Sequence, residues 1–232
     1  MAVNKNEPSL LWQGLSSGCG WRTASPLSLL VWGQLFIITL PASLTIQYNK
    51  DHGNGQNSGG AALYYLTFTI VYWLPVFVSA EPCLIVTDSL NYCHQHKSLR
   101  INAFVIMPTH LHLIVFDEAF DNERLQHTVN AMRQFTGRQL ANYCVEKMPA
   151  IFGQVISSPR RKDRTHQFWQ QSKHPVAIWS ESFWRTKVDY LHDNPRRKGL
   201  VQEATAWRFS SAGSWLLDPP EPCDVTLTGV AW

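Results

Sequence analysis

Beyond residue 60, three stretches of the chain have the composition of β-strands. LYYLTFTIVYW, residues 63–73, is rich in β-branched and aromatic side chains, and LRINAFVIM, residues 99–107, is almost wholly apolar. Pro108 and Thr109 interrupt the second run. HLHLIVF, residues 110–116, then continues as a further strand or as the second arm of a hairpin.

Helical spacing of apolar residues predicts three helices around these strands. Residues 82–96 form the first, with a proline near its start, and residues 121–147 form a long second helix. Residues 180–194 form the third, for which Ser180 is the expected N-cap and Pro195 the expected stop. Strands interleaved with helices predict an α+β sandwich with a central antiparallel pair and one layer of helices.

The beginning of the chain has a different pattern. Residues 25–44 are apolar but broken by polar and proline residues, which makes them a poor membrane span and a poor signal peptide. A weakly membrane-associated segment is the alternative there. A Gly/Asn-rich linker follows. We therefore predict an unassigned extension over 1–61, one domain over 62–217 and a C-terminal tail over 218–232.

Composition adds a limited number of constraints. The chain has 232 residues, of which 45% are hydrophobic, so a sizeable core is possible, and its net charge of +3 argues only weakly for a nucleic-acid partner. Five scattered cysteines without a C-x-x-C pair indicate neither a zinc ribbon nor a disulfide framework and favour a reducing cytoplasm. Two compact basic clusters are either solvated surface or phosphate contacts: Arg160, Arg161, Lys162 and Arg196, Arg197, Lys198.

The stretch IMPTHLHLIVF places two histidines one residue apart. In a strand, His110 and His112 point to one face while Leu111 and Leu113 pack on the other. Two imidazoles on one face can bind a divalent metal. The alternative is that one histidine caps a turn and the other lies at the surface. A second H-x-H, at 94–96, falls at a helix end, where residues two apart do not share a face.

The third predicted helix carries a tyrosine and an asparagine on one face. Tyr190 and Asn194 are four residues apart. Each residue alone is more typical of a core position or a helix stop. Together with His110 and His112, they suggest a metal held by two imidazoles and an amide, with the phenol beside it. A phenol has a pKa of about 10, and a metal that polarises the attacked phosphate would assist it. This arrangement suits DNA nicking through a covalent phosphotyrosine.

Several motifs resemble one known family. MPTHLHLIV resembles the H-hydrophobic-H signature of the HUH nucleases, and YLHDNPRRKGLV resembles the Y-x-x-x-N-P-x-x-x-G-L-V helix of the REP-associated tyrosine transposases, which are single-tyrosine HUH transposases. FWQQ, residues 168–171, and AWRFSSAGSW, residues 206–215, resemble the W-Q and W-x-x-S-S elements that flank this helix in the family, in the same order.

The resemblance implies a role for each motif residue. His110 and His112 would bind Mg²⁺ or Mn²⁺, Asn194 would be the third ligand, and Tyr190 would be the nucleophile. The implied fold is a ferredoxin-like or RRM-like sandwich, with a central antiparallel sheet, helices packed on it and the histidines on a central strand. The implied substrates are palindromic DNA hairpins, cut and rejoined as single strands by a cytoplasmic monomer or homodimer, with the two basic clusters as DNA contacts.

Two alternatives to a nicking enzyme remain open. One is a catalytically inactive relic of the same fold that binds hairpin DNA or RNA. The other is a metal hydrolase in which His110 and His112 act with a distant carboxylate such as Asp117. The hydrolase would not depend on Tyr190.

Overall fold

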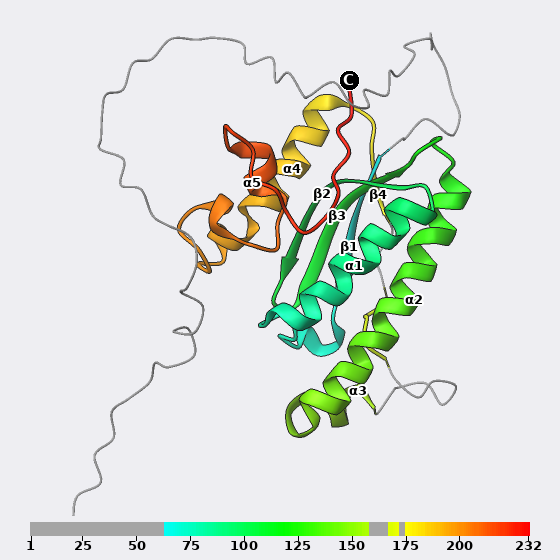
Figure 1. The fold of residues 1–232 in the computed structure, drawn as a ribbon, viewed down its shortest axis with the longest axis vertical. Coiled ribbons are helices and arrows are strands. Elements are labelled where there is room, and N and C mark those ends of the chain that lie inside the picture. Colours follow the sequence, from blue (N-terminus) through cyan, green and yellow to red (C-terminus); the bar gives the residue numbers. More distant parts are fainter. Residues whose placement is uncertain (1–62, 158–166, 172–174) are drawn as a thin grey trace, which may run out of the picture. The chain divides into compact units, whose positions relative to one another are not determined.

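The structure is a computed structural model, and it describes residues 63–157, 167–171 and 175–232 (Figure 1). The predicted extension over 1–61 and the predicted DNA contacts Arg160, Arg161 and Lys162 lie outside the described residues. None of the helices in the described part of the chain is long and apolar enough to cross a membrane.

A four-stranded antiparallel sheet forms the centre of the described fold. Its strands run in the order β2-β3-β1-β4 and comprise β1 (Leu63–Thr69), β2 (Leu99–Met107), β3 (His110–Asp117) and β4 (Val176–Ile178). Helix α1 (Ala80–His96) connects β1 to β2, and α2 (Asn122–Lys147) follows β3. This is the βαββαβ arrangement of ferredoxin-like folds, so the predicted fold class is confirmed.

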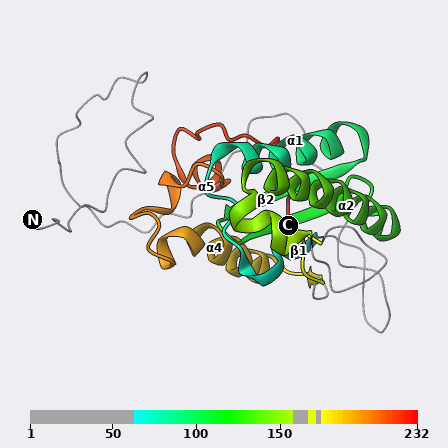
Figure 2. The same cartoon turned by 90° about the horizontal axis from the view of Figure 1, so that it is seen from below.

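Helices cover both faces of the sheet (Figure 1). Helices α1 and α2 pack on the face that carries Leu111 and Leu113, whereas α4 (Glu181–Arg197) packs on the face that carries Ile114 and Phe116. Figure 2 shows the sheet between these two groups of helices. The prediction of a single helix layer is therefore wrong. Strands β2 and β3 are nearly continuous apolar runs because both of their faces are buried.

Local signals fixed most element boundaries. Pro108 and Thr109 form the two-residue connection of a β2–β3 hairpin, which decides between the two alternatives that the sequence left open. Ser180 caps α4 as predicted, because its hydroxyl accepts the backbone N–H of Phe183 at 3.3 Å. The strand predicted over 63–73 is shorter, because it gives way to a one-turn 3₁₀ helix at Val71–Trp73.

The predicted end of α4 at Pro195 is wrong. The helix continues to Arg197, because a proline removes only its own N–H from the helical ladder and does not prevent the following residues from remaining helical. Gly199, at φ 68°, ends the helix instead. Its N–H donates to Arg196 at 2.9 Å and that of Leu200 donates to Pro195 at 3.0 Å, which are the two bonds of a Schellman cap.

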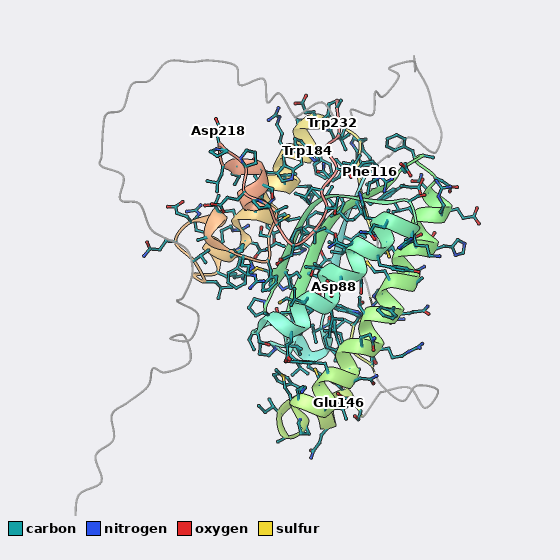
Figure 3. The ribbon with its side chains drawn as sticks, in the orientation of Figure 1. Asp88, Phe116, Glu146, Trp184, Asp218 and Trp232 are labelled. Atoms are coloured by element: carbon teal, nitrogen blue, oxygen red, sulfur yellow. The ribbon has the colours of Figure 1, made fainter. Side chains whose placement is uncertain are left out.

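The outer edge of β2 is covered by later parts of the chain. Residues 209–211 pair with it in an antiparallel direction, and Thr228 donates its N–H to the carbonyl of Ile101 at 2.8 Å. The ring of Trp232 lies 6.2 Å from that of Trp184 on α4 (Figure 3). The last residues of the chain thus contact both the sheet edge and the helix that carries Tyr190.

Candidate active site

The two histidines of β3 form the base of the site. His110 and His112 point toward α4, and their ring centres lie 4.7 Å apart at an interplanar angle of 74°. Only 6% of the His112 side chain is exposed, and His110 is partly buried. The two imidazoles therefore share one location, as the alternating pattern predicted, and the alternative of a turn cap and a surface histidine is wrong.

Threonine hydroxyls fix the orientation of both rings. Thr67, opposite His112 on β1, places its Oγ1 2.9 Å from His112 Nδ1, and Thr109 Oγ1 lies 2.9 Å from His110 Nδ1. If each Nδ1–H donates to its threonine oxygen, each Nε2 keeps a free lone pair. Such hydrogen bonds to the non-ligating nitrogen are the usual support of metal-binding histidines.

Both histidines are neutral at physiological pH. Burial, with a contribution from the charge of Lys198, lowers the pKa of His110 to about 4. Burial, with a contribution from His110, lowers the pKa of His112 to about 3. Neutral imidazole is the form that binds metals, so no deprotonation is needed at pH 7.

Helix α4 crosses over this pair with one face toward it. Near the start of that face, Lys187 Nζ lies 5.2 Å from the ring centre of Tyr65. The Tyr190 ring then lies 6.1 Å from that of His112, and Lys198 acts on His110. Asn194 lies one turn from both Tyr190 and Lys198 on the same face and is 4% exposed.

The Asn194 amide is a candidate ligand on chemical grounds. No group of three His, Cys, Asp or Glu side chains suited to a metal occurs within residues 63–157, 167–171 and 175–232. A metal on the two histidines would therefore need a third protein ligand of another type, and the amide oxygen of Asn194 is of that kind.

Asp117 is not available to the site. Asp117 is the last residue of β3, and by alternation its side chain is on the sheet face that packs against α1 and α2, opposite the face of His112. It is roughly 16 Å along the strand from His112. Its carboxylate binds the Arg124 guanidinium, with Nε at 2.7 Å, and accepts the backbone N–H of Ala119 at 2.9 Å. The metal-hydrolase alternative that used Asp117 is therefore wrong.

The three basic residues at the end of α4 differ in their surroundings. Arg196 Nε lies 2.5 Å from Asp193 Oδ1, so a carboxylate already balances its charge. The guanidinium of Arg197 lies 4.8 Å from the ring centre of Tyr190, which is 44% exposed. Lys198 is near enough for its charge to contribute to the lowered pKa of His110. Two of the three predicted DNA contacts thus flank the candidate nucleophile and metal site.

Two motifs support the site from a distance. Trp169 of the W-Q motif is buried and donates its indole N–H to Thr136 Oγ1 at 3.2 Å. Trp207 of the W-x-x-S-S motif donates to the carbonyl of Ile106 on β2 at 2.9 Å, and Ser211 lies 2.8 Å from Nε2 of His192 on α4. Trp169 thus joins the W-Q motif to α2, whereas Trp207 and Ser211 join the W-x-x-S-S motif to β2 and α4.

Sequence reasoning missed three supporting residues. Thr67 and Thr109 orient the histidines, and His192 joins α4 to β2 through Ser211. The adjacency of Thr109 to His110 was a usable signal. Thr67 could not be found, because its pairing with His112 spans 45 positions.

Comparison with known proteins agrees with the motifs. No protein-family model matches the chain. A Haemophilus influenzae protein named "Putative REP-associated tyrosine transposase" is 26% identical over 117 residues, which are 50% of this chain and 61% of that protein. The chain thus spans about three fifths of the length of this curated relative.

Two solved structures are also similar. One is a REP-associated tyrosine transposase bound to a REP hairpin, with 17% identity and a TM-score of 0.48 over 75% of this chain and 92% of that one. The other is a "putative transposase" from Deinococcus radiodurans, with 17% identity and a TM-score of 0.38 over 61% of this chain and 97% of that one. The motifs and the curated relative agree: the chain is similar to a protein named as a REP-associated tyrosine transposase.

Proposed function

We propose that the protein is a metal-dependent enzyme that nicks and rejoins single-stranded hairpin DNA through a tyrosine–DNA intermediate. The observation that carries this proposal is the position of Tyr190. Its ring is half exposed and lies 6.1 Å from His112, the more deeply buried of two adjacent neutral histidines. The candidate nucleophile therefore lies next to the candidate metal site.

In the proposed reaction, the Tyr190 hydroxyl oxygen attacks a DNA phosphorus atom. A bond forms between that oxygen and phosphorus, and the bond from phosphorus to the 3′ oxygen breaks. The 3′ oxygen takes up a proton from solvent and leaves as a free 3′-OH. The phenol proton passes to solvent, which reaches the ring. The guanidinium of Arg197, 4.8 Å from the ring centre, would balance negative charge that develops on the attacked phosphate. Attack by a 3′-OH on the phosphotyrosine reverses these steps and rejoins DNA.

The residues present suit a hard divalent cation. His110 and His112 would bind Mg²⁺ or Mn²⁺ through Nε2, and Asn194 would bind it through its amide oxygen. Once bound, the metal would polarise the phosphate oxygens and stabilise the developing charge. The protein contributes two oriented, neutral imidazoles and a buried amide.

The proposed substrate is a hairpin with unpaired DNA beside it, as the resemblance to the transposases implies. Arg197 and Lys198 flank the site and would contact phosphates. Arg196 contributes less because Asp193 balances its charge. The cluster at Arg160, Arg161 and Lys162 is proposed as a further contact from sequence alone.

Incubation with end-labelled hairpin oligonucleotides from the DNA flanking the gene tests the proposal. The expected result is a protein–DNA adduct that survives denaturation, requires Mg²⁺ or Mn²⁺ and disappears in chelator. The double variant His110→Ala, His112→Ala should lose the adduct while its circular dichroism stays unchanged, and Asn194→Ala should require more metal. Tight hairpin binding without any adduct would contradict the proposal and support the inactive, binding-only relic.

A further inference from the structure

The turn after β1 presents two large aromatic side chains to solvent. Trp73 is 59% exposed and Tyr72 is 51% exposed, although Val71 beside them is buried. Both exposed residues have left-handed backbone conformations, with φ 57° for Trp73 and 55° for Tyr72. This region is costly for residues other than glycine. Packing in the core does not explain these residues, because their rings are largely outside it.

Hydrogen bonds hold this strained turn to the site. Ile70, which precedes it, donates its N–H to Thr109 at 3.0 Å, and Phe77, which follows it, donates to Pro108 at 3.1 Å. Pro108 and Thr109 are the two residues directly before His110. The β1–α1 turn is therefore fixed to the hairpin turn that carries the candidate metal ligands.

The W-Q motif holds the same turn from its other side. Val71 donates its N–H to the carbonyl of Phe168 at 2.8 Å, and the Gln170 side chain donates to the carbonyl of Ile70 at 3.0 Å. The Gln170 backbone N–H also donates to Thr69 at 2.8 Å. The motif thus fixes where the exposed tryptophan stands and does not reach the reacting atoms.

Trp73 stands directly beside the metal ligands. Its ring centre lies 6.1 Å from that of His110, at an interplanar angle of 75°. An exposed, rigidly held indole next to a phosphate-binding site suits stacking on a nucleobase, because every base has an aromatic face. We infer that Trp73 is a stacking platform for an unpaired base of single-stranded DNA next to the phosphate that Tyr190 attacks. This inference rests on the proposed function, and it assigns the W-Q motif to positioning this platform.

Binding measurements with two probes test the inference. The first probe is fluorescein-labelled dT16, and the second is a strand of equal length whose sugars carry no bases, so that the phosphate charge is unchanged. The wild-type protein should prefer dT16. Trp73→Gly should reduce this preference by roughly tenfold, which is in the range for one base stacked on an aromatic ring. Affinity for the abasic strand should stay the same, and Trp73→Phe should retain most of the preference.

Ser98→Gly is the matched control. Ser98 also has a left-handed conformation, at φ 54°, but lies in the turn between α1 and β2. Both glycine variants remove backbone strain, so neither should lower the melting temperature, and only Trp73→Gly should lose base preference. An equal loss of affinity for both strands in Trp73→Gly, or a wild type without base preference, would overturn the inference even if Tyr190 forms an adduct. Base preference that depends on Trp73 without any adduct would instead refute the nicking proposal alone.

Discussion

Removing one buried hydroxyl should loosen the helix that carries Tyr190. Ser211 is fully buried, and its Oγ accepts the backbone N–H of Phe104 at 2.9 Å and lies 2.8 Å from His192 Nε2. The same hydroxyl lies 3.2 Å from the carbonyl of Phe104. All of these bonds coexist when His192 Nε2–H donates to Ser211 and the hydroxyl donates to Phe104. Burial lowers the pKa of His192 to about 4, so the ring is neutral.

The cost of this change depends on the groups left without partners. In Ser211→Ala, the N–H groups of Phe104 and His192 both remain buried and unpaired, whereas the Phe104 carbonyl keeps the backbone N–H of residue 211 at 3.0 Å. An unpaired buried donor costs about 1–3 kcal/mol, so two of them should lower the free energy of unfolding by about 2–6 kcal/mol. That loss is a large part of the stability of an ordinary domain.

Urea unfolding, followed by circular dichroism, measures this change. Ser214→Ala is the control. The hydrogen bond that the Ser214 hydroxyl donates to the Glu221 carbonyl is exposed to solvent, so its loss should cost less than about 1 kcal/mol. A double-mutant cycle with His192→Leu should show coupling of about 1–3 kcal/mol. When residue 192 is leucine, Ser211→Ala no longer leaves a buried imidazole N–H without an acceptor. A Ser211→Ala cost below about 1 kcal/mol, or the absence of coupling, would refute this hydrogen-bond network.

Three further predictions concern the metal, the DNA and pH. Thr67→Val should weaken Mn²⁺ binding by about 10- to 100-fold in calorimetry, because it removes the group that orients His112; unchanged affinity would show that the threonine has no such role. Arg197→Gln should reduce the slope of log affinity against log salt by about 0.7 on single strands, and Arg196→Gln should reduce it less because a carboxylate already balances Arg196; equal changes would contradict this assignment. The lowered pKa of His192 contributes stability that is fully present above pH 6.5. As the pH falls from 6.5 toward 4, the unfolded chain takes up a proton that the folded chain excludes. The free energy of unfolding should therefore fall by up to about 1.4 kcal/mol per pH unit. His192→Phe should reduce the pH dependence of urea-unfolding stability over that range, while the part contributed by the lowered pKa values of His110 and His112 remains. An unchanged slope would argue against a buried neutral ring.

Local patterns were sufficient for the parts of the site that lie within one element. Alternation along β3 placed His110 and His112 on one face, and the spacing of four placed Tyr190 and Asn194 on one face of a helix. Neither pattern could show that the two faces meet. That contact depends on α4 packing on the sheet face opposite α1 and α2, and the resemblance to a family was needed to expect it.

Features that depend on distant pairing could not be predicted. β4 has only three residues, Val176–Ile178, and exists because it pairs with β1, so it carries too little pattern of its own. The strain at Trp73 depends on hydrogen bonds from the hairpin turn and the W-Q motif, which lie tens of residues away. Pro195 misled the prediction because a helix can continue past a proline until another residue ends it, and here Gly199 supplies the stop.

A second tyrosine beside the histidines allows a controlled test of the claim that Tyr190 is the nucleophile. Tyr65 also lies beside the histidines, with its ring centre 5.2 Å from that of His112, but it is only 7% exposed. Burial raises the pKa of its phenol well above the usual value, which makes it a poor nucleophile. Tyr65→Phe and Tyr190→Phe each remove one oxygen, so they form a matched pair at the same site.

Mapping of the DNA-linked peptide by mass spectrometry, on wild type and on both variants, tests the account most directly. The account predicts that the adduct lies on Tyr190, that it persists in Tyr65→Phe and that it vanishes in Tyr190→Phe while hairpin binding remains. An adduct on Tyr65 or on any other tyrosine, or undiminished cleavage by Tyr190→Phe, would contradict the assignment of Tyr190 as the nucleophile.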